Sequence, residues 1–98
     1  MTGVRPGPVE IQVRLFGRYR CLLPEGCATI RLMEGCHLSD LVRELEHLVI
    51  WPGPKPLRDA VTEETVRVLI NGRYVRAGDN QELNSGDVVA LVSPVAGG

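Results

Sequence analysis

Two glycines, Gly97 and Gly98, end the chain, and their types and position fit a chemical role. Glycine has no Cβ, so a Gly-Gly end presents a thin backbone that can adopt almost any φ and ψ. Such an end can be threaded into the active site of another enzyme, where its carboxylate becomes the reacting group. We therefore interpret the Gly98 carboxylate, presented by Gly97, as the part of this chain that undergoes chemistry.

The residues before the two glycines would position them. Pro94 fixes its own φ and stiffens the base of the segment, and Val95 offers an apolar grip to a partner. We count Pro94, Val95 and Ala96 among the partner-binding residues. Residues 93–98 are expected to form a flexible tail that leaves the last strand of the domain.

The cysteines and histidines give a weaker chemical signal. Cys21, Cys27 and Cys36 are spaced C-x5-C-x8-C, without a CxxC pair and one short of the four thiolates of a ferredoxin cluster. We therefore predict no metal site and interpret the thiols as buried or idle. His37 and His47 are interpreted as helix-end or surface residues. The sequence shows no nucleophile–base pair and no phosphate-binding glycine loop, so the chain is expected to be a protein substrate rather than a catalyst on its own.

Size and charge narrow the function classes. The chain has 98 residues, enough for one domain, and a net charge of -1. A nucleic-acid binder would be basic or carry a basic stripe, so we predict no nucleic-acid partner. The pairs Arg18/Arg20 and Arg73/Arg76 are interpreted as solvated strand faces.

Targeting signals are not visible in the sequence. No apolar run is long enough to span a bilayer, and residues 1–8 lack the apolar core of a signal peptide. Three cysteines, an odd number, favour a reducing compartment. We expect a cytoplasmic protein with no membrane partner, in which residues 1–8 form a flexible arm and residues 9–92 form the folded domain.

Hydrophobic periodicity predicts the elements of that domain. Alternation with a period of two indicates four strands, at residues 9–15, 28–33, 66–71 and 88–92. Apolar residues with a 3.6 period predict a helix over residues 38–49, with Ser39 as its N-cap, before a proline-rich break and one turn near residues 57–61. Asn71-Gly72 is a strong hairpin signal. One helix packed across a mixed sheet is the economical α+β arrangement.

The alternation also predicts an apolar patch on the face of the sheet that the helix does not cover. If Leu15, Val89 and Leu91 face the helix, then their neighbours in sequence face away from it. An uncovered apolar patch indicates a partner surface. The alternative is that the parity is reversed and these residues are core. The predicted outward residues are Phe16, Leu69, Val88, Ala90 and Val92.

Four segments carry a family resemblance: IQVRLFG at 11–17, LSDLV at 38–42, ING at 70–72 and SGDVVALVSPVAGG at 85–98. Together they resemble the MoaD/ThiS family of ubiquitin-like sulfur carriers, most closely the small subunits of molybdopterin synthase. The resemblance covers roughly residues 9–98, and its most specific part runs from Gly86 to the end. It implies a β-grasp fold and partner-surface positions at Phe16, Tyr74 and Val92.

The resemblance also implies a reaction sequence. An E1-like enzyme would use ATP to adenylate the Gly98 carboxylate, and a sulfur donor would convert it to a thiocarboxylate. The sulfur would then reach a precursor of molybdopterin while the tail lies in a large, MoaE-like synthase subunit. The chain itself would bind no cofactor, because the ATP is consumed by the activating enzyme.

Some positions depart from the family pattern, so alternatives stay open. Ser93 stands where proline is common, Val88 where an acidic residue is usual, and the stretch after Trp51 is longer than in thiamine-pathway carriers. The sulfur could instead serve a tungsten cofactor, cysteine, thiamine or tRNA thiolation. A ubiquitin-like modifier joined to lysines, or a plain β-grasp binding module with incidental terminal glycines, are the other hypotheses.

Overall fold

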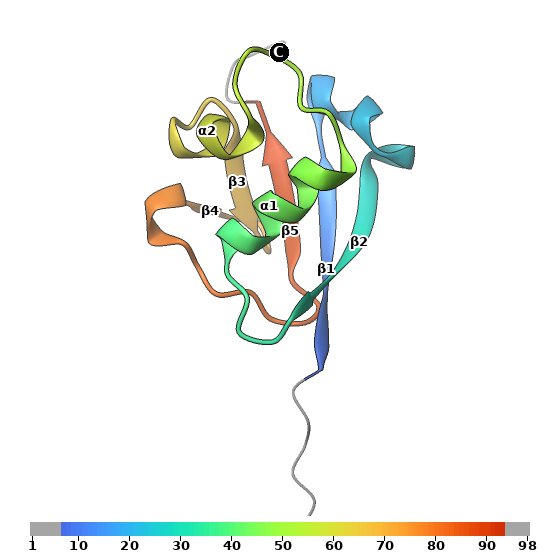
Figure 1. Cartoon of the computed structure of the whole chain (residues 1–98), viewed down its shortest axis with the longest axis vertical. Coiled ribbons are helices and arrows are strands. Elements are labelled where there is room, and N and C mark those ends of the chain that lie inside the picture. Colours follow the sequence, from blue (N-terminus) through green and yellow to red (C-terminus); the bar gives the residue numbers. More distant parts are fainter. Residues whose placement is uncertain (1–6, 94–98) are drawn as a thin grey trace, which may run out of the picture.

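The computed structural model describes residues 7–93, which form one mixed five-stranded sheet with helices on one of its faces (Figure 1). The strand order is β2-β1-β5-β3-β4. The central strands β1 and β5 are parallel, and the other neighbours are antiparallel. The strands are β1 (Pro8–Leu15), β2 (Cys27–Met33), β3 (Arg67–Ile70), β4 (Arg73–Val75) and β5 (Val88–Val92).

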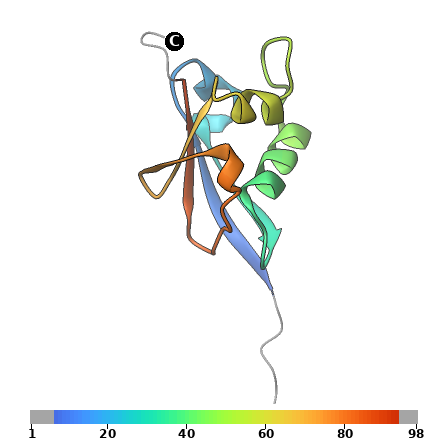
Figure 2. The same ribbon diagram turned by 90° about the vertical axis from the view of Figure 1, so that its left-hand side faces the viewer.

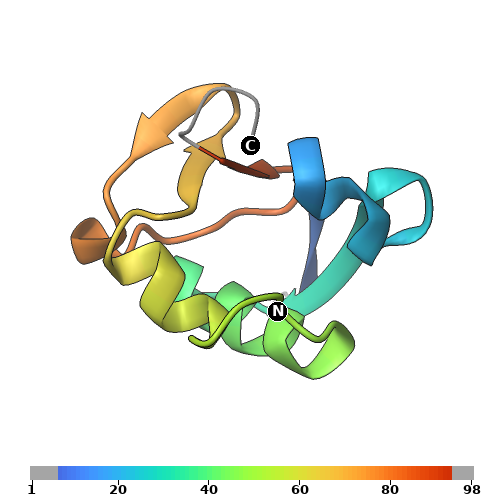
Figure 3. The ribbon, with the colours of Figure 1, turned by 90° about the horizontal axis from the view of Figure 1, so that it is seen from above.

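Two α-helices and three short 3₁₀ helices connect the strands. The helices α1 (Leu38–Leu48) and α2 (Leu57–Thr62) lie on the same side of the sheet, and its opposite face is left open (Figures 2 and 3). The 3₁₀ helices are η1 (Gly17–Leu22), η2 (Pro24–Gly26) and η3 (Ala77–Asp79). The predicted β-grasp arrangement, a mixed sheet with one main helix across it, is confirmed.

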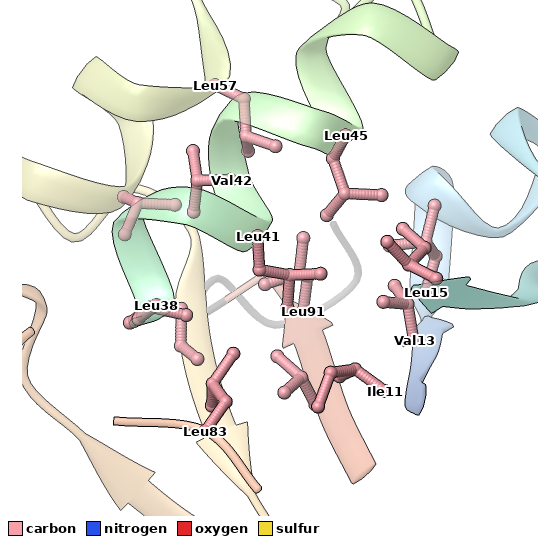
Figure 4. Close-up of a cluster of buried hydrophobic side chains, with 14 of the residues drawn as sticks. Ile11, Val13, Leu15, Leu38, Leu41, Val42, Leu45, Leu57, Leu83 and Leu91 are labelled. Carbon is pink, nitrogen blue, oxygen red and sulfur yellow. The ribbon is translucent and has the colours of Figure 1, made fainter. Parts of the chain in front are cut away.

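The core fills the space between α1 and the inner face of the sheet (Figure 4). Every second residue of β1 and β5 is buried, as the period of two requires. The helix contributes one apolar stripe at 3.6 spacing. The fully buried side chains of these elements include Ile11, Val13, Leu41, Leu45, Val89 and Leu91, all with zero relative exposure.

The start of α1 differs from the sequence prediction. The N-cap is His37, whose backbone N–H donates to the Asp40 carboxylate at 2.8 Å. Ser39 was therefore the wrong cap, because Leu38 already has to be helical to bring its buried side chain under the sheet. The Ser39 N–H, left without an intrahelical acceptor as in any first turn, donates to Asn80 Oδ1 at 2.9 Å.

The hairpin between β3 and β4 forms at the predicted residues. Asn71 and Gly72 have φ of 53° and 84°, the two positive values that a two-residue type I′ turn requires. The Asn71 side chain also ties this turn to the start of β5: its amide donates to Asp87 at 2.9 Å and its oxygen accepts the Val88 N–H at 2.9 Å. These bonds help to fix the register between β3 and β5.

The connections hold features that the sequence did not indicate. Arg18 and Arg20, expected on a strand face, lie instead in the 3₁₀ helix η1, in which Tyr19 is buried. The Tyr19 ring stacks on Trp51 at a centroid distance of 4.6 Å, so the proline-rich loop after α1 is anchored to the far end of β1. Strand β1 begins at Pro8, one residue inside the segment predicted as an arm.

Candidate functional site

The tail comes directly after the central strand of the sheet. Strand β5 lies between β1 and β3, and the last described residue is Ser93, next to Val92 in sequence. A central strand is held by hydrogen bonds on both sides, so it provides a fixed base for the segment that leaves it. The predicted tail site residues lie outside the described residues; they are Pro94, Val95, Ala96, Gly97 and Gly98.

The outer face of the sheet shows the predicted parity. In β5, Val89 and Leu91 are fully buried against the helix, whereas Val88, Ala90 and Val92 point to the open face and are half-buried. The same alternation in β3 turns Leu69 outward. The reversed-parity alternative is therefore wrong.

Phe16 lies beside the end of β5. Its backbone N–H donates to the Leu91 carbonyl at 3.1 Å, which continues the parallel register that pairs Leu15 with Leu91. Leu15 is 2% exposed and Phe16 is 47% exposed, so two neighbouring residues occupy opposite faces of the sheet. A large apolar side chain left this open, next to the outward Val92, is suited to bury itself against a partner.

Tyr74 of β4 lies on the same open face, on the far side of β3 from β5. The register pairs Leu69 with both Ala90 and Tyr74, so the three residues form one row on the open face. The Tyr74 hydroxyl donates a hydrogen bond to Glu64, which raises the pKa of Tyr74 above its ordinary value. The Arg67 guanidinium lies over the ring at 5.5 Å, so the Tyr74 side chain is held from two sides.

We call the exposed and half-buried apolar residues of this face the outer strip. It consists of Phe16, Leu69, Tyr74, Val88, Ala90 and Val92. The structure therefore brings together the three partner-surface residues predicted from the sequence, Phe16, Tyr74 and Val92, on the open face of the sheet whose central strand leads into the tail. Their role in binding stays a prediction.

Two residues on this face were missed by the sequence analysis. Arg14 and Arg67 are exposed and have the same parity as Phe16 and Leu69, which come two residues later in the chain. Extending the alternation backward along each strand would have placed both arginines on the same face as the strip, although not next to it.

The cysteines do not form a cluster with other ligands. Cys21 and Cys27 are exposed, and Cys36 is buried. Burial raises the pKa of the Cys36 thiol, and the nearby Asp40 carboxylate raises it further. Within residues 7–93, no group of three or more His, Cys, Asp and Glu side chains is arranged to hold a metal ion.

A groove is present on the helix side, away from β5. It has a volume of about 390 Å³ and lies between α1, α2 and η3. The charged groups of Glu46 and Arg58 in it are already matched: the Glu46 carboxylate accepts hydrogen bonds from the backbone N–H and the guanidinium of Arg58, at 3.0 and 3.1 Å. The groove therefore presents no poised acid, base or nucleophile.

One further structural finding concerns membranes. Over residues 7–93, no helix is both long enough and apolar enough to cross a bilayer.

Comparison with known proteins gives consistent matches. Residues 13–98 match the ThiS family, so the match includes Gly98. The chain is 31% identical over 90 residues to a molybdopterin synthase sulfur carrier subunit of Chlamydomonas reinhardtii, covering 92% of this chain and 100% of the relative. It is 29% identical over 92 residues to small archaeal modifier protein 3 of Haloferax volcanii, again covering 92% of this chain and 100% of the relative.

A solved structure supports the same assignment. The fold superimposes with a TM-score of 0.67 on a putative molybdopterin converting factor subunit 1 from Pyrococcus furiosus. The two chains are 32% identical, and the alignment covers 89% of this chain and 99% of the other.

Proposed function

The chain belongs to the ThiS family of ubiquitin-like sulfur carriers and modifiers, and from this premise we propose that it carries sulfur on Gly98 for molybdopterin synthesis. The observation that carries the proposal is the family match that runs through Gly98, combined with full-length similarity to a molybdopterin synthase sulfur carrier subunit. The Pyrococcus structure, described as a molybdopterin converting factor subunit, supports the same pathway.

The proposed activation solves a chemical problem. A carboxylate is a poor electrophile because its negative charge repels a nucleophile. In the proposed step a Gly98 oxygen attacks the α-phosphorus of ATP in an E1-like enzyme, and pyrophosphate leaves. Sulfide (HS⁻) supplied by a donor then attacks the acyl carbon, AMP leaves, and loss of a proton gives the thiocarboxylate on Gly98.

The fold supports this role by separating two tasks. The outer strip gives a partner something to hold, and the central strand β5 leads from that surface into the segment that ends at Gly98. No side chain of this domain has to act on the substrate. The proposed partners are the activating enzyme, a sulfur donor and a large synthase subunit, into which the thiocarboxylate tail would insert.

A second candidate function rests on the similarity to small archaeal modifier protein 3. After the same adenylation, the acyl group of Gly98 would pass to a target lysine and form an isopeptide bond. The two functions share the first step and differ in the acceptor. Conjugates of this chain on lysines would favour the modifier, and a free thiocarboxylate would favour the carrier.

The test uses the activating enzyme encoded in the same genome. ATP–pyrophosphate exchange is measured with the wild-type chain and with a variant that carries one alanine after Gly98. We expect exchange with the wild type only, while thermal unfolding of the two proteins is the same, because the addition leaves residues 7–93 unchanged. Equal exchange in both would contradict a requirement for Gly98 at the end of the chain, and no exchange in either would favour a plain binding module.

A further inference from the structure

The arginines of this nearly neutral protein are not evenly distributed. Among residues 7–93, four salt bridges are found, and their cations are Arg31, Arg43, Lys55 and Arg58. Arg43, Lys55 and Arg58 belong to the helix layer, where residues 38–63 hold five carboxylates against three cations. None of these salt bridges involves the other six arginines of residues 7–93, and three of those six, Arg14, Arg67 and Arg76, lie beside the outer strip.

These three arginines surround the outer strip. Arg14 of β1 pairs with Ala90, and Arg67 of β3 pairs with Val92, so the two lie on opposite sides of β5. Neighbouring strands are about 4.8 Å apart and residues rise about 3.3 Å, which gives a Cα separation of about 12 Å for this diagonal pair. The β5 residues of the strip therefore have a guanidinium on each side, from Arg14 of β1 and Arg67 of β3.

Arg67 also has a second arginine beside it. Arg76 follows directly on β4 and is extended and exposed, and continuing the register by one residue beyond the Val68–Val75 pair would place it opposite Arg67. Both arginines act on the pKa of Tyr74, which shows that they share one locality. Like charges at opposed strand positions repel each other, and a carboxylate of a partner would relieve such repulsion.

The donors of Arg67 are arranged for an external carboxylate. Its guanidinium lies over the Tyr74 ring, which restrains the side chain but leaves its N–H groups at the edge of the plane. The Glu64 carboxylate beside this ring accepts the Tyr74 hydroxyl instead. A restrained guanidinium fork that takes part in none of the salt bridges of residues 7–93 is suited to bidentate recognition of a carboxylate.

We propose that the outer strip docks on a protein whose apolar contact surface is flanked by carboxylates, one group facing Arg67 and Arg76 and another facing Arg14 about 12 Å away across β5. This inference rests on the proposed function, because it describes the partner that receives the tail. Such charges would steer the encounter and fix the orientation of the strip, and the apolar contacts would supply most of the affinity.

The test measures equilibrium binding to the activating enzyme of the same genome, by calorimetry without ATP. The variants are Arg67→Gln/Arg76→Gln and Arg14→Gln. The control is Arg43→Gln, which removes one charge on the helix side from an exposed pair. We expect the double variant to raise the Kd about tenfold and Arg14→Gln a few-fold, with no change for the control. The Kd of the wild type should rise as the ionic strength increases from about 0.05 to about 0.5 M, and the Kd of the double variant should rise by a smaller factor.

Each outcome separates this inference from the proposed function. Arginine-dependent binding without ATP–pyrophosphate exchange would uphold the inference and contradict activation. If exchange occurs and the Kd is unchanged by salt and by substitution of all three arginines, the proposed function is upheld and the inference is overturned. Absence of binding would overturn the inference, and absence of both binding and exchange would overturn the proposed function as well. Tighter, arginine-dependent binding of a single-stranded oligonucleotide would overturn the inference in favour of a nucleic-acid surface.

Discussion

Truncating Leu15 and Phe16 separately should divide stability from binding, because the two neighbours lie on opposite faces of the sheet. Leu15 is 2% exposed and belongs to the core, so Leu15→Ala should lower the free energy of unfolding by about 2–5 kcal/mol. The total free energy of unfolding of a small domain is of the order of 5–15 kcal/mol, so this loss is a large part of it. Phe16→Ala should change the free energy of unfolding by less than about 1 kcal/mol.

The binding effect of Phe16→Ala can be calculated from its exposed area. A phenylalanine can bury about 200 Å², and 47% exposure leaves about 95 Å² for a partner to cover. At about 25 cal/mol per Å², this corresponds to about 2.4 kcal/mol, or about a 60-fold rise in Kd. Urea unfolding and calorimetry with the activating enzyme measure the two effects. A Phe16→Ala protein that binds as the wild type does would refute the assignment of the outer strip as the docking surface.

Three other predictions concern single side chains. Asn71→Ala should lower the free energy of unfolding by about 1–2 kcal/mol, because it removes the hydrogen bonds to the Asp87 side chain and to the Val88 N–H. Urea unfolding measures this, and an unchanged midpoint of the urea transition would contradict it. Iodoacetamide should modify the two exposed cysteines before Cys36, whose burial raises its pKa; peptide mapping that finds Cys36 modified first would oppose it. The hydrogen bond to Glu64 raises the pKa of Tyr74, so the contribution of this bond to stability is present below pH about 10 and is lost as the pH rises through the pKa of the folded state. Glu64→Ala should lower the pKa of Tyr74 in an absorbance titration. An unchanged pKa would contradict the bond.

The parts of the fold that sequence could predict are those controlled by local periodicity. Alternation in β1 identifies its inner face because polar residues separate the apolar ones, whereas β5 is apolar throughout and only the structure decides which of its two parities is correct. Asn71-Gly72 indicated the hairpin for a similar local reason: both residues tolerate positive φ.

The parts that sequence could not predict depend on contacts between distant segments. Tyr19 is buried in part because Trp51, from the loop after α1, stacks on it. Ser39 was predicted as the N-cap because serine is a common residue at that position. The helix instead begins at Leu38, whose side chain is buried, and His37 is the N-cap. The cap preference is worth about 1 kcal/mol, less than burying a leucine.

The same distinction applies to the candidate site. The outward position of Phe16 could be inferred from the alternation in β1, whereas that of Val92 was decided by the structure. The neighbouring positions of Arg67 and Arg76 depend on the register of the hairpin, and their relation to Arg14 depends on the parallel pairing of β1 with β5. Strand order is a non-local property, so the charged frame of the strip was visible only in the structure.

The central claim is that Gly98 carries sulfur, and the most direct measurement is the intact mass of the chain after incubation with ATP, its activating enzyme and a sulfur donor. We predict a species heavier by the exchange of one oxygen for one sulfur, with the change located in the C-terminal peptide. A mass that stays unmodified under these conditions, with an active enzyme confirmed on another carrier, would contradict the claim.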